Sequence, residues 1–91
     1  MSVEVRLPTV LRSRAGGQTI VQANGATIGE VLADLVRSYP AMAGQLLTDE
    51  GSLHRFVNVY LNDDDVRYLE QLETKVADGD TVSILPAVAG G

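Results

Sequence analysis

Residues 27–39 read TIGEVLADLVRSY, and this stretch decides the fold because it predicts one long helix. Its apolar residues recur at helical spacing and form a single stripe; they are Ile28, Val31, Leu32, Leu35 and Tyr39. Thr27 is suited to cap the first turn, and Glu30, three residues later, completes a capping box. Pro40 follows directly, and a residue before proline disfavours the helical region. We therefore expect a helix that buries one face and ends near Pro40.

The segment before this helix predicts a hairpin of two strands. Residues 3–7 alternate apolar and charged side chains, which is the period of a half-buried strand, and Pro8 ends it because proline cannot donate to a sheet. Residues 18–23, QTIVQA, are rich in β-branched side chains and predict the second strand. A longish loop that contains the turn signal Gly16-Gly17 would join the two strands.

The segment after the helix predicts further strands. Residues 56–61, FVNVYL, and residues 81–86, TVSILP, have the composition of strands, and a strong turn at 77–80 precedes the second of them. Residues 66–68 predict a short edge strand, and residues 41–47 a short second helix. The order of elements is thus strand, strand, helix, strand, short strand, strand.

This order predicts an α+β fold with a mixed sheet over one main helix. Strand-to-helix-to-strand crossovers are right-handed, which points to the β-grasp (ubiquitin-like) arrangement. The last strand would then lie centrally, beside the first. A chain of 91 residues forms one domain; we expect it to comprise residues 1–86, followed by a flexible tail at 87–91.

Composition and charge exclude several classes of function. The chain has no cysteine, which excludes disulfides, thiolate catalysis, iron–sulfur clusters and cysteine zinc sites, and the single His54 cannot form a histidine metal site. A net charge of −5 disfavours nucleic acid and anionic membranes as partners. The acidic run at 63–65 predicts a solvated turn rather than a cation site. We find no catalytic nucleophile paired with a general base, no membrane-spanning segment and no signal segment. We therefore expect a cytoplasmic protein that is not an enzyme.

The last residues of the chain are the first candidate site. They are apolar or small, in the order Pro86, Ala87, Val88, Ala89, Gly90 and Gly91. The five residues after Pro86 span at most about 16–18 Å when extended, which is enough to carry a terminal carboxylate into another protein's cleft. Two glycines have no Cβ atom, so the backbone can enter a narrow channel. The alternative is that the Gly-Gly end is merely frayed.

The second candidate site is an apolar group on the predicted sheet. Phe56, Tyr60 and Leu85 would share the face that points away from the helix. An exposed apolar patch often marks a docking surface, and we expect one here for a partner protein. The alternative is that these residues only shield the sheet, or pack beneath residues 41–52.

Two motifs connect the chain to a known family. Residues 77–86, ADGDTVSILP, combine a Gly-Asp turn, a strand and a proline, and Gly90-Gly91 closes the chain. Residues 56–62, FVNVYLN, form the other motif. In both, the chain resembles the ubiquitin-like sulfur carriers, typified by the small molybdopterin synthase subunit and the thiamin sulfur carrier. The resemblance covers the whole chain, and the ending LPAVAGG and the stretch LHRFVN at 53–58 are most similar to the actinobacterial carriers of cysteine biosynthesis.

The resemblance implies a reaction cycle for Gly91. An E1-like adenylyltransferase would use ATP and Mg²⁺ to convert the Gly91 carboxylate to an acyl adenylate. A sulfur source would then displace AMP and leave a thiocarboxylate, from which a biosynthetic enzyme takes sulfur for cysteine or another metabolite. The chain would bind no cofactor or metal itself. A metalloprotease that processes the tail is a further possible partner, and a ubiquitin-like modifier or a non-covalent binding module are the alternative functions.

Overall fold

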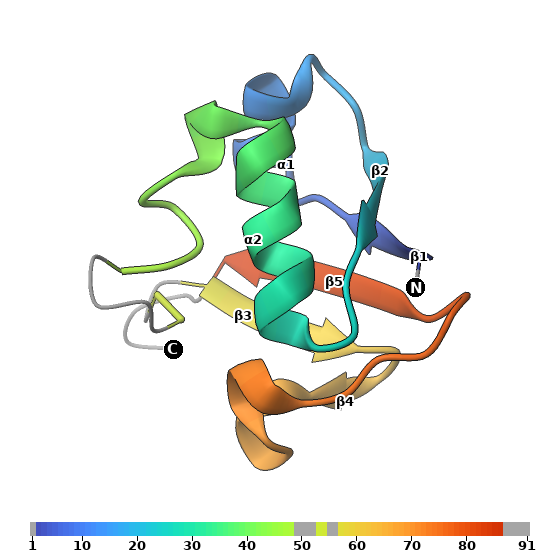
Figure 1. Cartoon of the computed structure of the whole chain (residues 1–91). Helices are drawn as coiled ribbons and strands as arrows, with labels where there is room; N and C mark the ends of the chain where they lie inside the picture. Colours follow the sequence, from blue (N-terminus) through green and yellow to red (C-terminus); the bar gives the residue numbers. More distant parts are fainter. Residues whose placement is uncertain (1, 49–52, 55–56, 87–91) are drawn as a thin grey trace.

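A mixed five-stranded sheet, with one long helix across one of its faces, forms the body of the protein (Figure 1). The structure is a computed structural model and describes residues 2–48, 53–54 and 57–86. The strands are ordered β2-β1-β5-β3-β4 across the sheet. Their bounds are Ser2–Arg6 for β1, Ile20–Asn24 for β2, Val57–Leu61 for β3, Asp64–Asp65 for β4 and Thr81–Pro86 for β5.

Strand β5 lies in the middle of the sheet, as the sequence predicts. It runs parallel to β1, with Val82 opposite Val5, and antiparallel to β3, with Ile84 opposite Val59. All other pairings in the sheet are antiparallel. The first and last strands are therefore neighbours, and both are flanked on each side by another strand.

The long helix α2, Ile28–Ser38, forms where the apolar stripe predicts it. The Thr27 side chain accepts a hydrogen bond from the Glu30 amide at 3.2 Å, and Glu30 Oε1 accepts from the Ala26 amide at 3.0 Å. The capping box is thus confirmed, with Glu30 reaching one residue further back than the cap itself. Such a cap contributes about 1 kcal/mol to helix stability.

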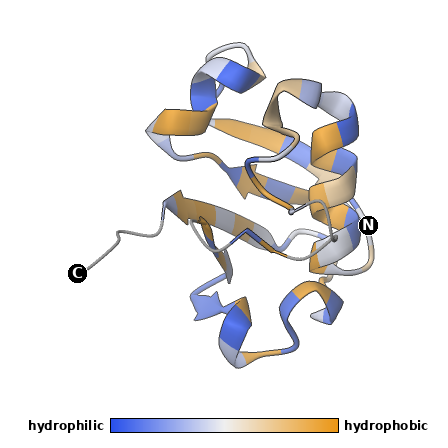
Figure 2. Cartoon of the chain, turned by 90° about the vertical axis from the view of Figure 1, so that its left-hand side faces the viewer, coloured by the Kyte–Doolittle hydropathy of each residue, from blue (hydrophilic) through white to orange (hydrophobic). Residues whose placement is uncertain are grey.

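The core lies between α2 and the inner face of the sheet. It is built mainly from aliphatic side chains, and Figure 2 shows hydrophobic residues alternating with hydrophilic ones along the strands. The four apolar residues of the helix stripe that lie within α2 are at most 1% exposed. The strands contribute Val3, Val5, Val21, Ala23, Val57, Val59, Val82 and Ile84. This packing holds the helix across the sheet.

The connection between β1 and β2 is not the plain loop that the sequence predicts. It contains the short helix α1, Thr9–Arg12, and a 3₁₀ turn at Ser13–Ala15, and this turn ends on Gly16 with a φ of 68°. Leu11 and Ala15 are buried, so this excursion caps one end of the core. A four-residue helix has too few positions to display a periodicity, which is why the sequence pattern does not indicate it.

Two expectations for the other connections are wrong. The expected short helix at 41–47 is a 3₁₀ turn at Pro40–Met42 followed by turns. The expected edge strand at 66–68 is also a 3₁₀ turn, Val66–Tyr68, while the edge strand is β4. The reason is local, since the Asp65 side chain accepts from the Arg67 amide at 2.9 Å and caps the turn while Val66 is buried. A second 3₁₀ turn, Gln71–Glu73, follows.

The expected turn before β5 is confirmed. Gly79 has a φ of 88°, a conformation that glycine adopts without strain. Asp80 Oδ2 accepts from the Ala77 amide at 2.8 Å, and the Gly79 amide donates to the Ser2 carbonyl at 3.0 Å. The turn is therefore bonded both to itself and to β1. Within the described ranges, no helix has the length and apolar character to cross a membrane.

Candidate functional site

The C-terminal end of β5 is the structural origin of the predicted tail. The last described residue, Pro86, is exposed and pairs with Val57 at the rim of the sheet. Proline cannot donate a hydrogen bond, so it ends a central strand without breaking the ladder before it. The predicted tail residues beyond it lie outside the described residues; they are Ala87, Val88, Ala89, Gly90 and Gly91.

Two hollows flank the end of β5. The smaller, of about 210 Å³, lies toward Gln45 and His54, and the larger, of about 650 Å³, lies toward Arg12 and Ile20. Five residues contribute to the lining of both hollows: Pro8, Val10, Ile84, Leu85 and Pro86. The start of α1 and the end of β5 therefore form a ridge between the two hollows.

Exposed apolar side chains gather around this ridge. Val10 is 65% exposed, Leu85 46% and Ile20 43%. Together with Pro8 and Pro86 they form what we call the tail-root surface. Contiguous exposed apolar groups at the rim of a groove are typical of a site where another protein docks.

The structure brings together only part of the predicted docking group. Tyr60 and Leu85 do lie on the same outer face, because Tyr60 is opposite Ser83 and Asn58 is opposite Leu85. Tyr60 is half-buried, however, and it lines neither hollow. Phe56 lies outside the described residues.

Sequence reasoning missed Val10 and Ile20. Val10 belongs to α1, which the sequence pattern does not reveal, and Ile20 looks like an ordinary residue of a strand. One signal was present in the strand: Val21 and Ala23 point to the core, so the alternation places Ile20 on the outer face. That reasoning still says nothing of its nearness to β5.

The larger hollow differs in charge from the rest of the molecule. Its lining includes Arg6 and Arg12 and, within the part of the chain that the structure describes, no acidic residue, although the chain has 12 acidic and 7 basic residues. Arg12 Nε donates to the Leu7 carbonyl at 3.2 Å, and Arg6 Nε lies 3.3 Å from Glu4 Oε2. An exposed pair such as Arg6–Glu4 contributes little to stability, so its main effect is to orient the guanidinium.

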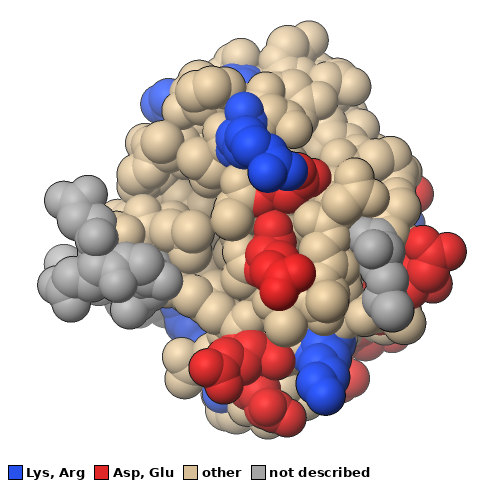
Figure 3. Space-filling view, in the orientation of Figure 1, with Lys and Arg blue, Asp and Glu red and all other residues tan. Residues whose placement is uncertain are grey.

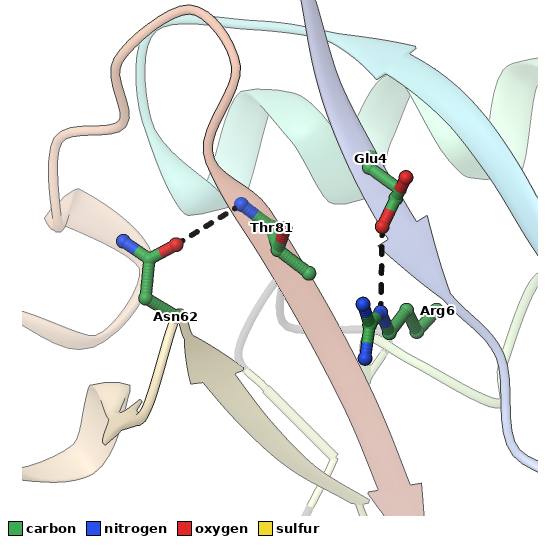
Figure 4. A network of polar contacts seen from close by, with 4 residues as sticks. All are labelled: Glu4, Arg6, Asn62 and Thr81. Carbon is green, nitrogen blue, oxygen red and sulfur yellow. Dashed lines mark hydrogen bonds and ion pairs between the residues drawn. The ribbon is translucent and has the colours of Figure 1, made fainter.

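The start of β5 is held by polar contacts. Figure 4 shows the Asn62 side chain accepting from the Thr81 amide at 3.2 Å, and the Glu4–Arg6 pair on the neighbouring strand β1. The Asn62 amide in turn donates to the Thr81 carbonyl at 2.7 Å. Because the strand is fixed at this point, its exit at the opposite rim is fixed as well.

Asp34 is a titratable group with a structural role. A hydrogen bond from the Asn24 amide at 2.8 Å, together with an ion pair to Arg37, lowers the pKa of Asp34 from its ordinary value of 3.8. These contacts tie the end of β2 to α2. In the part of the chain that the structure describes, no three histidine, cysteine or acidic side chains are grouped to hold a metal ion.

Comparison with family models decides the classification. The ThiS family model matches residues 5–91. This chain belongs to the ThiS family. The ThiS-family chain is 52% identical to the sulfur carrier protein CysO of Mycobacterium tuberculosis, over the full length of both proteins. It is 38% identical to small archaeal modifier protein 3 of Haloferax volcanii, also over the full length of both.

Solved structures agree with this classification. In the crystal structure of the Amycolatopsis orientalis BexX/CysO complex, the matched chain superimposes with a TM-score of 0.89 and 49% sequence identity. The match covers 98% of this ThiS-family chain and 99% of the other. The mixed sheet with its single long helix is therefore the β-grasp fold, as the order of elements predicts.

Proposed function

We propose that this ThiS-family chain is a sulfur carrier whose reacting group is the carboxylate of Gly91. The observation that carries the proposal is the position of Pro86, which is exposed at the end of the central strand β5 with five residues still to follow. The similarity to a sulfur carrier over the full length of both chains supports it. The chain acts as a protein co-substrate, and its partners supply the catalysis.

The proposed chemistry begins with activation of a poor electrophile. A Gly91 carboxylate oxygen attacks the α-phosphorus of ATP in an E1-like adenylyltransferase, and pyrophosphate leaves with the help of Mg²⁺. A sulfur nucleophile then adds to the acyl carbon and expels AMP, which leaves a thiocarboxylate. Its sulfur passes to a biosynthetic enzyme that makes cysteine or another sulfur-containing metabolite. This cycle would run in the cytoplasm, where ATP is available.

The proposed partners would use the tail and the tail-root surface together. Residues 86–90 enter the active site of the adenylyltransferase and later that of the sulfur-accepting enzyme, over a reach of at most about 16–18 Å. Leu85 docks the body of the domain, together with Val10 and Ile20, and Tyr60 extends the contact along the outer face. Phe56 is a further proposed docking residue. A metalloprotease that processes the tail is a further proposed partner.

Intact mass spectrometry tests the proposal. The chain is incubated with its cognate adenylyltransferase, ATP, Mg²⁺ and sulfide, and the expected product has one oxygen replaced by sulfur. Omission of ATP should prevent the change, and digestion should locate it in the C-terminal peptide. An unchanged mass, with the partner nevertheless bound, would instead make the chain a non-covalent binding module.

A second candidate function is protein modification through Gly91. It is favoured by the 38% identity to a small archaeal modifier protein. The same acyl adenylate would then be attacked by the amine of a lysine, with AMP as the leaving group and an isopeptide bond as the product. Adducts on lysines of other proteins, in the same incubation with added cell extract, distinguish this function from sulfur transfer.

A further inference from the structure

A second exposed apolar group lies apart from the tail-root surface. Tyr68 is 87% exposed and Leu69 44%. Both belong to the turns that follow β4, at the bottom of Figure 1, whereas β5 ends at the left of that view. Neither residue lines the hollows at the end of β5.

A separate hollow opens beside Leu69. It has a volume of about 480 Å³, and its lining is Leu53, Leu69, Glu70, Gln71, Leu72 and Glu73. None of these residues lines either hollow at the tail root. We call this hollow, together with Tyr68, the Tyr68 surface.

The backbone holds the Tyr68 surface in place. The Leu69 amide donates to the Val66 carbonyl at 3.0 Å, and Val66 is fully buried. The Glu70 amide donates to the hydroxyl of Thr74 at 3.0 Å, and Thr74 is only 6% exposed. A partner that binds a preformed surface spends little free energy on ordering it, which makes exposed apolar groups effective there.

The charge of the Tyr68 surface is opposite to that of the larger hollow at the tail root. Among the described residues, the hollow beside Leu69 is lined by Glu70 and Glu73 and by no basic side chain, whereas Arg6 and Arg12 line the larger hollow at the tail root. Figure 3 shows acidic side chains in the middle of the view, and acidic and basic side chains next to each other in its lower part. Surfaces of opposite charge select different partners, because like charges brought together at an interface repel.

We propose that the Tyr68 surface docks a partner protein through a basic segment that carries an apolar side chain. The apolar side chain fills the hollow against Leu69, the exposed ring of Tyr68 on the preceding residue adds apolar surface, and the basic side chains lie against Glu70 and Glu73. The two docking surfaces share no lining residue. This inference does not depend on sulfur carriage.

A peptide titration followed by NMR tests the proposal. The probe is Lys-Leu-Lys-Phe-Lys-Leu-Lys, and the control peptide has glutamate in place of each lysine. The basic peptide should shift the backbone amides of residues 66–74 and leave those of Val10, Ile20 and Leu85 unchanged. No shift at 66–74, or equal shifts with the acidic peptide, would overturn the proposal.

Variants of the full chain sharpen the same experiment. Tyr68→Ser, and the double change Glu70→Gln with Glu73→Gln, should each weaken peptide binding about tenfold. Leu85→Ser is the matched control at the tail root and should bind the peptide as the parent does. Equal affinities for all variants would sink the idea. Concentration-dependent shifts at 66–74 without peptide would replace it with self-association of this chain.

Discussion

The two ends of β5 are built in opposite ways. At the start of the strand, Asn62 and Thr81 bond to each other in both directions, and Gly79 bonds back to β1. At the far end, Leu85 and Pro86 are exposed and stand between two hollows. The contacts at the start stabilise the strand, whereas the residues at its far end are exposed on the surface. A domain that hands its tail to other proteins benefits from this separation, because docking residues can be exposed without weakening the fold.

The largest expected effect comes from removing Gly91. The truncated chain should form no thiocarboxylate, because its new terminal carboxylate, on Gly90, would stop one residue short of the partner's reacting site. Its melting temperature should match that of the parent, because the described core is formed by residues 3–84. The mass assay and a thermal melt check both statements. Conversion of the truncated chain, or its unfolding, would contradict the assignment of Gly91.

Two neighbours on β5 provide a matched pair. Ile84 is 1% exposed and Leu85 46% exposed, although both are aliphatic and lie next to each other. Ile84→Ala should destabilise the domain by about 3 kcal/mol through the cavity that it leaves. Leu85→Ala should change stability by no more than about 0.5 kcal/mol.

In the adenylation assay, the substitution at Leu85 should have the larger effect and the substitution at Ile84 the smaller one. Leu85→Ala should raise the KM for the carrier about tenfold, because it removes an apolar contact at the centre of the tail-root surface. Ile84→Ala should leave this KM near that of the parent at a temperature where the variant is folded. Urea denaturation and adenylation kinetics provide the two measurements, and equal KM values would argue against docking at Leu85.

A smaller effect is expected at the start of β5. Asp80→Ala removes the hydrogen bond from the Ala77 amide to the side chain, at 2.8 Å, and should lower the free energy of unfolding by about 1 kcal/mol. Adenylation should be unaffected, because the exit of β5 at Pro86 is unchanged. A change in KM without a loss of stability would reverse the roles given to the two ends.

The smallest effect concerns acid stability at the same rim. Asp34 accepts from the Asn24 amide, and its pKa lies below the ordinary value of 3.8. A depressed pKa in the folded state adds stability above the unfolded-state value, and this contribution is lost as the pH falls through the folded-state pKa. Asp34→Asn should therefore lower stability at neutral pH and reduce its decline below pH 3.8. Urea denaturation at several pH values checks both, and parallel curves for parent and variant would contradict it.

Much of the fold could be predicted because the relevant signals are local. The helix bounds follow from Thr27, Glu30 and Pro40, which act within a turn of their own positions. Alternation in residues 81–86 predicts which face of β5 is buried, and the structure confirms it for Val82 and Ile84. The 3₁₀ turn at Val66–Tyr68 was missed because burial of Val66 and the Asp65 cap outweigh strand propensity there.

What the sequence determined by itself is the β-grasp order of elements, the buried stripe of α2 and the central place of β5. The first two depend on periodicity and on capping, which act between residues close together in the chain, and the third follows from the right-handedness of crossover connections. Only the tertiary structure decided the tail-root surface and the Tyr68 surface. Val10, Ile20 and Leu85 lie on three separate elements, and no local pattern encodes their meeting. Packing of those elements around one core brings the three side chains to the same rim.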